Sequence, residues 1–382
     1  MSAMIVVFHT PSNAGYAMSP LEKIFFQVAC DLYGGQEKVH FSFKDLESGM
    51  PESLPKGFDN VIQIDMGSQD QEMLERASCY IKSNGITSAL VFDLQVKSST
   101  CSMLRAAGVQ TIISYWGSPI SSFNNKLMLL LKRIEVALAK NKPDLFIFES
   151  EAMRALAVHG RGILKRNTVV IPTGVDTDRF KPIPNAKCYL AEKFNISKAH
   201  KVALYTGHME ARKGVMVIIE AAIKLKEMHC EDDWHFLICG NRPGEEREFL
   251  EALEGTRAKN SVTFGGYRND IDKIAGGCDI GVIASTGWDS FPMSSLEMAS
   301  CGLPLLVSAL QGLTETIDGG KTGLSFEPGN SAELANLILQ IDQNEPLRQQ
   351  YSIAARKRIL EHYSQALQYS RLMTCMSSVL DK

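Results

Sequence analysis

Two carboxylates with seven residues between them are the first feature of the sequence that could do chemistry. Asp289 follows an apolar run that reads as a buried strand, and Glu297 lies in a segment of helical character. Pro292 fits the first position of that helix, where no amide hydrogen is needed, and Gly302 fits the position just past its end. The two carboxylates could therefore accept hydrogen bonds from the hydroxyls of one polyol. The alternative is an exposed loop acid and a solvated helix glutamate.

Two segments combine a strand, a turn and a helix. The runs KVALYTG (201–207) and DIGVIAS (279–285) each lead into such a turn, and Ser294 and Ser295 lie in the first turn of the later helix. Unpaired amide groups and the positive end of a helix dipole meet at such a point, so it is suited to bind an anion. Neither segment reads GxGxxG or GxxxxGK[ST], so the dinucleotide and P-loop fingerprints are absent.

Short apolar runs alternate with longer helical segments along the chain, and the pattern occurs twice. It is typical of a parallel sheet with helices on both faces. A stretch rich in proline and aspartate, 171–186, separates the halves. We expect two doubly wound α/β domains with a cleft between them, and ligands outside the carboxyl ends of the strands. The expected strands are 3–10, 60–66, 88–94, 109–116, 144–150, 168–172, 201–207, 234–240, 261–266, 279–285 and 304–309.

The composition excludes several classes of protein. The chain has 382 residues, 45% hydrophobic and 22% charged, which is typical of a globular protein long enough for two domains. A formal net charge of −3 argues against a general nucleic-acid binder. Nine scattered cysteines without CxxC spacing predict free thiols in a reducing compartment. We find no apolar run of membrane-spanning length and no signal peptide, so we expect a cytoplasmic protein.

Six segments, taken in order, resemble the retaining GT-B glycosyltransferases of the group 1 (GT4) family. The resemblance covers residues 170–365, while the first half matches mainly in strand order. The segments are VIPTGVDTDRFKP (170–182), ALYTGHMEARKGV (203–215), SVTFGGYRND (261–270), CDIGVIAST (278–286), DSFPMSSLEMASCGLPLLVS (289–308) and QGLTETIDGGKTGLSFEPGN (311–330).

The resemblance implies a GT-B fold, in which two Rossmann-like domains face each other across a cleft. It places an acceptor-side domain at 1–180 and a domain that binds the nucleotide-sugar donor at 181–364. The segment 365–382 is then a helix that returns to the N-terminal domain.

The family's paired glutamates correspond here to Asp289 and Glu297. The resemblance implies that Glu297 binds the ribose diol of the nucleotide and that Asp289, shorter by one methylene, contacts the donor sugar. The family's basic pair falls on His208 and Lys213, with histidine in place of an arginine. Lys213 is expected to neutralise the diphosphate, and we take Lys213, Asp289 and Glu297 as the catalytic residues.

Further donor contacts are implied at other loops. Gly15 lies in TPSNAGYAMSP (10–20), which looks like the family's glycine-rich loop facing the diphosphate but lacks its double glycine. The remaining expected donor-binding residues are Gly207, Tyr267, Arg268, Phe291, Met293, Ser294 and Ser295.

The acceptor side departs from the family pattern. Where the family often has a His-Gly pair near the reacting carbon, this chain has Trp116 and Gly117, followed by Ser118. Tryptophan cannot act as a base, so Trp116 is expected to stack on an acceptor or shape its pocket, unless it is a core residue. Asp93 ends a strand and could hydrogen-bond a substrate hydroxyl or simply cap a helix.

The resemblance implies transfer of a sugar from a nucleotide-diphosphate sugar to a hydroxyl acceptor, with retained anomeric configuration and without a metal or other cofactor. The expected partners are the donor and a glycan or lipid-linked acceptor of bacterial-type polysaccharide, lipopolysaccharide or glycolipid synthesis. Residues 124–142 have basic residues beside an apolar stripe, as a helix on a membrane surface has, unless the stripe faces the core. The alternatives are a sugar-nucleotide epimerase of the same fold and a catalytically silent subunit that binds sugar nucleotides.

Overall fold

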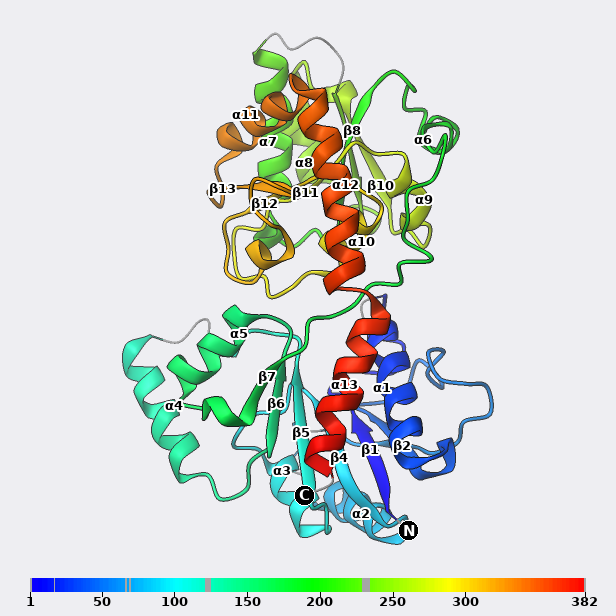
Figure 1. Cartoon of the computed structure of the whole chain (residues 1–382), viewed down its shortest axis with the longest axis vertical. Coiled ribbons are helices and arrows are strands. Elements are labelled where there is room, and N and C mark those ends of the chain that lie inside the picture. Colours follow the sequence, from blue (N-terminus) through cyan, green and yellow to red (C-terminus); the bar gives the residue numbers. More distant parts are fainter. Residues whose placement is uncertain are drawn as a thin grey trace. The chain divides into compact units, whose positions relative to one another are not determined.

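The computed structural model describes residues 2–16, 18–65, 67–68, 70–120, 125–228 and 234–380. The chain forms two compact units, which are described separately below (Figure 1). Unit 1 consists of Met1–Pro172 and Gln368–Lys382, and unit 2 of Thr173–Leu367.

Unit 1 contains a seven-stranded sheet in the order β3-β2-β1-β4-β5-β6-β7, and every pair of neighbouring strands is parallel. The strands are β1 (Ala3–Val7), β2 (Val39–Phe43), β3 (Val61–Gln63), β4 (Ile86–Phe92), β5 (Thr111–Trp116), β6 (Leu145–Phe148) and β7 (Thr168–Val170). The helices are α1 (Met18–Tyr33), α2 (Gln71–Ser83), α3 (Ser99–Ala106), α4 (Lys126–Leu138), α5 (Glu151–Ala155) and a π-helical turn (Leu156–Arg161), with 3₁₀ turns at Gln36–Lys38 and Lys165–Asn167.

Unit 2 contains a six-stranded parallel sheet in the order β10-β9-β8-β11-β12-β13. The strands are β8 (Lys201–Thr206), β9 (Trp234–Cys239), β10 (Val262–Gly266), β11 (Ile280–Ile283), β12 (Leu305–Ser308) and β13 (Gly323–Phe326). The helices are α6 (Lys187–Phe194), α7 (Val215–Glu227), α8 (Arg247–Leu253), α9 (Ile271–Gly276), α10 (Met293–Ser300), α11 (Ser331–Asp342) and α12 (Glu345–His362), with 3₁₀ turns at Ala211–Lys213, Lys259–Ser261 and Leu313–Thr316.

Both sheets are doubly wound, as the alternation of apolar runs and helical segments predicted. In each unit the chain starts near the middle of the sheet, builds outward to one edge, and then returns to build the other half. The strand order therefore reverses between β1 and β4 in unit 1 and between β8 and β11 in unit 2. In open α/β sheets, ligands bind outside the carboxyl ends of the strands at this reversal.

The central strands are buried on both faces, which explains why they read as continuous apolar runs. In unit 1, Phe25 of α1 and Tyr115 of β5 belong to the core on one face, and Ile81 of α2 belongs to the core on the other. The expected strand 60–66 is shorter than predicted, because pairing is limited to Val61–Gln63 at the sheet edge; its last residue lies outside the described residues.

The last described helix, α13 (Gln365–Leu380), supplies a side of the core of unit 1. Leu372 and Met376 are fully buried in the same core as Phe25. The linker around Val175 instead pairs with unit 2, since its amide donates to the Tyr363 carbonyl (2.8 Å) and its carbonyl accepts from Gln365 (2.9 Å). The units consequently divide at 172/173 and 367/368, where the sequence placed 180/181 and 364/365.

Candidate active site

In unit 2, the loops after β8 and β11 touch at the strand reversal. Gly214 follows the 3₁₀ turn Ala211–Lys213 with φ +69°, a left-handed conformation that favours glycine. A Cβ atom at this position would lie 1.8 Å from the carbonyl oxygen of Ala284, just after β11. The close approach allowed by Gly214 therefore brings Lys213 beside the end of β11.

Lys213 forms an ion pair with Asp289. The Lys213 Nζ atom lies 2.9 Å from Asp289 Oδ2, and the Ser285 hydroxyl donates to the same oxygen at 2.8 Å. Asp289 is only 6% exposed and the Lys213 side chain 17%. A loop acid open to solvent, which the sequence allowed, is thus wrong for Asp289. The arrangement holds a lysine ammonium group and a carboxylate at the point where this fold binds ligands.

A second close approach fixes the loop that carries Asp289. Asp289 forms a parallel bridge with Gly312, whose φ is +81°. A Cβ atom on Gly312 would lie 1.9 Å from the Ser290 carbonyl oxygen, so any larger residue would push the loop away. Asp289 is therefore positioned by backbone packing as well as by its hydrogen bonds.

Arg212 points to different partners from its neighbour Lys213. Its guanidinium lies over the Trp288 ring at 4.2 Å from the centroid and donates to the Trp288 carbonyl at 3.2 Å. Its Nε atom also lies 2.7 Å from a carboxylate oxygen of Glu210. Arg212 thus anchors the loop of Trp288, and its charge is partly balanced by Glu210.

Before Lys213, the loop residue His208 is exposed and the strand residue Tyr205 beneath the loop is buried. The His208 carbonyl accepts a hydrogen bond from the Tyr205 hydroxyl at 2.7 Å. Burial, followed by the nearby Asp289 charge, raises the pKa of Tyr205, so this phenol stays protonated and donates. Gly207 is approached closely by Gly240, where a Cβ atom would lie 2.0 Å from the Gly207 carbonyl oxygen.

Helix α10 carries the second predicted carboxylate. The helix begins at Met293, so the position predicted for Pro292 is wrong by one residue: Pro292 precedes the helix, with an extended ψ of 128°. Gly302 lies just past the end with φ +84°, as expected. Glu297 is only 3% exposed, so it is not a solvated helix glutamate. Glu297 is instead one of the buried residues of α10.

The other predicted donor residues of unit 2 differ in accessibility. Ser295 is fully buried, and its hydroxyl donates to the Pro292 carbonyl at 2.7 Å, so it stabilises the start of α10. Ser294 and Met293 are half-buried at the same helix start. Phe291 is buried, with its ring 5.3 Å from that of Tyr363.

Tyr267 and Arg268 follow β10 but have different environments. Tyr267 is 61% exposed. Arg268 Nε donates to Asp270 Oδ1 at 2.7 Å, and the guanidinium lies over the Phe194 ring at 5.4 Å. This pairing lowers the pKa of Asp270 to about 2. Arg268 is thus engaged within unit 2, whereas Tyr267 offers a ring face to solvent.

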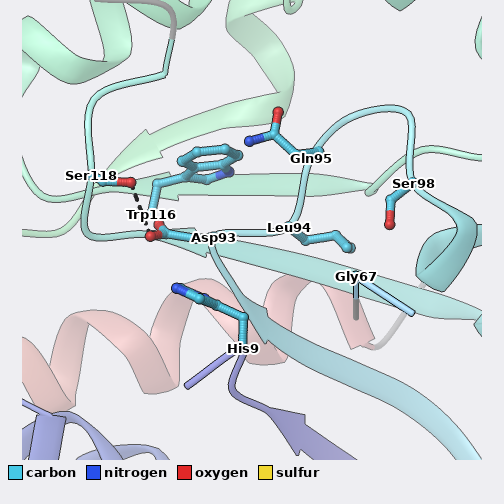
Figure 2. A pocket seen from close by; sticks show the side chains of 8 residues that line it. All are labelled: His9, Gly67, Asp93, Leu94, Gln95, Ser98, Trp116 and Ser118. Carbon is cyan, nitrogen blue, oxygen red and sulfur yellow. Dashed lines mark hydrogen bonds between the residues drawn. The ribbon is translucent and has the colours of Figure 1, made fainter. Parts of the chain in front are cut away.

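In unit 1, residues at or after the ends of β1, β3, β4 and β5 line a pocket of about 360 Å³ (Figure 2). Asp93 has a left-handed backbone, φ +54°, and its two carboxylate oxygens accept from the Gly117 amide and the Ser118 hydroxyl, both at 2.9 Å. Figure 2 shows Asp93 with the His9 ring on one side and the Trp116 ring on the other. The lining residues are His9, Gly67, Asp93, Leu94, Gln95, Ser98, Trp116 and Ser118.

The environment of Asp93 settles one alternative. The cap of α3 is Ser98, whose side chain accepts from the Thr100 amide, so Asp93 is not a helix cap. Burial raises the pKa of Asp93 despite the hydrogen bonds from Gly117 and Ser118 and the nearby His9. A hydroxyl-bearing ligand in this pocket would meet a carboxylate that is already oriented.

Trp116 has two kinds of contact. It is 2% exposed and shares a core cluster with Phe146 and Phe148, so packing is one of its roles. It also lines the pocket, and its buried Nε1 atom has no hydrogen-bond partner among the described residues. An unsatisfied buried N–H group is costly, and an acceptor oxygen on a bound ligand would satisfy it.

Several pocket and site residues were missed at the sequence level. Ser285 and His9 both stand at the carboxyl end of a strand beside the reversal, and Gln95 and Ser98 follow β4. The rule that ligands bind outside these ends is the signal that could have identified them. Gly15, which was predicted, lies in an exposed loop of unit 1, with φ +120° and no atom within 4 Å of a built Cβ.

Two further observations concern the described part of the chain. It contains no group of three or more histidine, cysteine and acidic residues placed to hold a metal ion. None of its helices combines the length and apolar character needed to cross a bilayer.

The comparisons with known proteins agree with this fold. The model of the family "Glycosyl transferases group 1" matches residues 190–358, which include β8, β11 and α10. Residues 190–358 therefore match a glycosyl transferases group 1 domain. The solved structure of Anabaena Alr3699/HepE in complex with UDP has a TM-score of 0.80 at 16% identity, covering 98% of this chain and 100% of that one. The fold is GT-B, with two Rossmann-like domains.

Curated glycosyltransferases match part of the chain. Phosphatidyl-myo-inositol mannosyltransferase of Mycobacterium leprae (strain TN) is 27% identical over 219 residues, 56% of this chain and 55% of the relative. The Campylobacter jejuni N,N'-diacetylbacillosaminyl-diphospho-undecaprenol alpha-1,3-N-acetylgalactosaminyltransferase is 30% identical over 207 residues, 53% of this chain and 52% of the relative. The chain thus spans about half the length of the curated relatives it matches.

Proposed function

We propose that the protein transfers a sugar from a nucleotide-diphosphate sugar to a hydroxyl acceptor. One observation carries the proposal: Lys213, Asp289 and Ser285 are joined at the strand reversal of the sheet that the family model covers. A cation and a carboxylate at this point suit a ligand with an anionic and a polyhydroxylated part.

We assign the donor contacts to unit 2. Departure of a nucleoside diphosphate places negative charge on its outer phosphate, and the Lys213 ammonium group would stabilise that charge as it develops. Glu297 is assigned to the ribose hydroxyls and Asp289 to those of the donor sugar. His208, exposed before Lys213, would donate a ring N–H to the diphosphate.

Retention of anomeric configuration and independence of metal are parts of the same proposal. Lys213 is a fixed cation close to Asp289, so it can play the electrostatic role at the diphosphate that a divalent ion plays elsewhere. The leaving phosphate would accept the proton of the acceptor hydroxyl, so no histidine is required at the position of Trp116. Full activity in EDTA, and retention seen by NMR of the product, are the expected results.

The acceptor is assigned to the pocket of unit 1. Asp93 would accept from an acceptor hydroxyl, and the unsatisfied Trp116 N–H would donate to one of its oxygens. Relatives are named for lipid-linked acceptors, such as the diphospho-undecaprenol of the Campylobacter enzyme. We therefore propose a glycan or lipid-linked acceptor of polysaccharide, lipopolysaccharide or glycolipid synthesis.

The experiment is a thermal-shift panel of UDP-, GDP- and ADP-sugars, followed by NMR of the stabilising donor with and without acceptors. Transfer to an acceptor that is lost in Lys213→Ala and Glu297→Ala, with both variants folded, supports the assignment. Unimpaired turnover in both variants contradicts it. Interconversion of the donor without an acceptor would identify an epimerase. Binding with neither transfer nor slow hydrolysis would identify a silent binding subunit.

A further inference from the structure

Helix α4 presents its most apolar face to solvent. Leu127, Leu131, Ile134 and Leu138 are spaced i, i+4, i+7 and i+11, so they form one stripe along the helix. Their exposed fractions are 68%, 53%, 48% and 75%, in that order. The residue of this helix that is buried, Val136, lies on the opposite side. The core-facing alternative from the sequence is therefore wrong for this stripe, although Asn124, where the predicted segment starts, lies outside the described residues.

This exposure is concentrated rather than scattered. Thirteen large hydrophobic residues are exposed in the described part of the chain, and six of them belong to α4, including Met128 and Leu130 beside the stripe. Single exposed leucines are ordinary on protein surfaces, but a contiguous apolar patch marks a site of interaction. In Figure 1, α4 lies at the side of unit 1 where β6 and β7 lie.

Basic residues surround the stripe. Lys126 and Arg133 lie on one flank of α4, and Lys132 lies on the other, where it pairs with Glu135 at 2.8 Å. Gly162 packs on Arg133 of α4, since a Cβ built on Gly162 would lie 3.2 Å from Arg133 Cγ. Two residues after Gly162, the chain reaches the exposed segment Leu164–Arg166, which adds two more basic side chains.

The charge of the surrounding sequence is opposite to that of the chain. Residues 125–166 contain nine lysines and arginines against four acidic residues, whereas the whole chain has a net charge of −3. Lys140 and Lys142 directly follow α4, and Lys165 and Arg166 end the same stretch. The segment that carries the apolar stripe is thus net positive in a chain that is net negative.

We propose that the outward face of α4, together with Lys165 and Arg166, binds the surface of an anionic lipid bilayer. Leucine side chains of a helix lying in the plane of the interface enter the boundary between headgroups and acyl chains, while lysines and arginines extend to the phosphates. A symmetric contact with a second copy would instead bring the basic flanks of both copies together, which is unfavourable.

This surface goes beyond the proposed function and does not depend on it. It belongs to unit 1, and β5, which ends at the pocket residue Trp116, precedes α4 in the same unit. A protein held on the bilayer by α4 would keep unit 1 close to a lipid-anchored acceptor, a consequence that, unlike the surface itself, rests on the proposed function.

Co-sedimentation of the full chain with vesicles tests the proposal. We expect binding to phosphatidylcholine vesicles containing a quarter phosphatidylglycerol, weaker binding to phosphatidylcholine alone, and loss of binding as NaCl is raised. The triple variant Leu127→Ser, Leu131→Ser, Leu138→Ser should lose at least about tenfold in vesicle affinity. The matched control, Ile353→Ser with Leu360→Ser, removes two exposed apolar residues of α12 in unit 2 and should bind unchanged.

A second variant tests the charges. Lys126→Gln with Arg133→Gln should weaken binding to the anionic vesicles about fivefold for each charge removed, and should leave binding to phosphatidylcholine unchanged. Circular dichroism and the thermal shift given by nucleotides should be the same in all variants, which separates membrane binding from donor binding. Absence of binding to anionic vesicles at low salt, or equal binding by the triple variant, would overturn the proposal. So would a dimer in light scattering that the triple variant abolishes, because the stripe would then be a self-association surface.

Discussion

If Lys213 binds the diphosphate, the affinity for a nucleoside diphosphate should fall when Lys213 is replaced and rise when Asp289 is replaced. Their atoms are 2.9 Å apart, so the Coulomb attraction between them is roughly 6 kcal/mol at an effective dielectric constant of 20, before desolvation is subtracted. A diphosphate must compete with Asp289 for the ammonium group. Asp289→Asn removes the competing charge, and recovery of about 1 kcal/mol of that attraction would tighten nucleoside diphosphate binding about fivefold.

The same reasoning gives the effect of removing the cation. Lys213→Met deletes a hydrogen bond between charged groups, worth about 1.5–3 kcal/mol, so affinity should fall roughly 10- to 150-fold. Calorimetry with UDP, GDP or ADP, whichever binds the wild type, measures both changes. Ser285→Ala, which removes only the hydroxyl hydrogen bond at 2.8 Å, serves as the matched control and should stay within about twofold.

The rate of sugar transfer should be measured in the same variants and compared with nucleoside diphosphate binding. Asp289→Asn should lose transfer although it binds the nucleoside diphosphate more tightly, because the carboxylate is assigned to the donor sugar, which the bare diphosphate lacks. Equal weakening of binding in Asp289→Asn and Lys213→Met would refute the competition. It would indicate that the pair is needed only to keep the loop folded. Wild-type affinity in Lys213→Met would remove the diphosphate contact altogether.

Three further outcomes follow from particular contacts. Gly214→Ala should destabilise the fold by about 2–4 kcal/mol in urea unfolding, because its Cβ would overlap the Ala284 carbonyl. The control Gly255→Ala has a similar backbone, φ +74°, but open space around the new Cβ, so it should cost only about 1 kcal/mol. Equal costs for the two variants would contradict the close approach at Gly214. Burial lowers the pKa of His235 to about 4, so its neutral form stabilises the fold fully above the unfolded pKa near 6.5. About 3 kcal/mol should be lost as the pH falls from there toward 4, and His235→Gln should flatten this slope in urea titrations; a slope unchanged by the substitution would exclude His235 as its source. Asp93→Asn should raise the KM for the acceptor at least about tenfold and change the KM for the donor less than twofold, and a rise in the donor KM instead would exclude Asp93 from the acceptor pocket.

The doubly wound sheets and the position of Asp289 in the loop after β11 were predictable from the sequence, because both depend on local patterns. Apolar runs fix the strands, and the turn after each run fixes where side chains leave the sheet. The partner of Asp289 was not predictable from spacing alone, since Lys213 is 76 positions earlier and reaches it through the glycine contact at Ala284.

The burial of Glu297 and the exposure of α4 could not be predicted for a related reason. Helical periodicity shows that a stripe exists, but it does not show whether another element covers it. The leucines of α4 and those of a core helix have the same spacing, and only the packing of Val136 reveals which side faces inward. The domain boundaries likewise depend on a backbone pairing between Val175 and residues near 364, which no local pattern encodes.

The position of α13 determines the order in which the two units can be completed during synthesis. Leu372 and Met376 fill the core of unit 1, yet the ribosome translates them only after the whole of residues 173–367. While unit 2 emerges and folds, the nascent first unit still exposes the apolar surface around Phe25 that α13 will cover. Unit 2, although second in the sequence, can therefore be the first to reach its finished state, and a nascent unit 1 is the part that needs protection from aggregation.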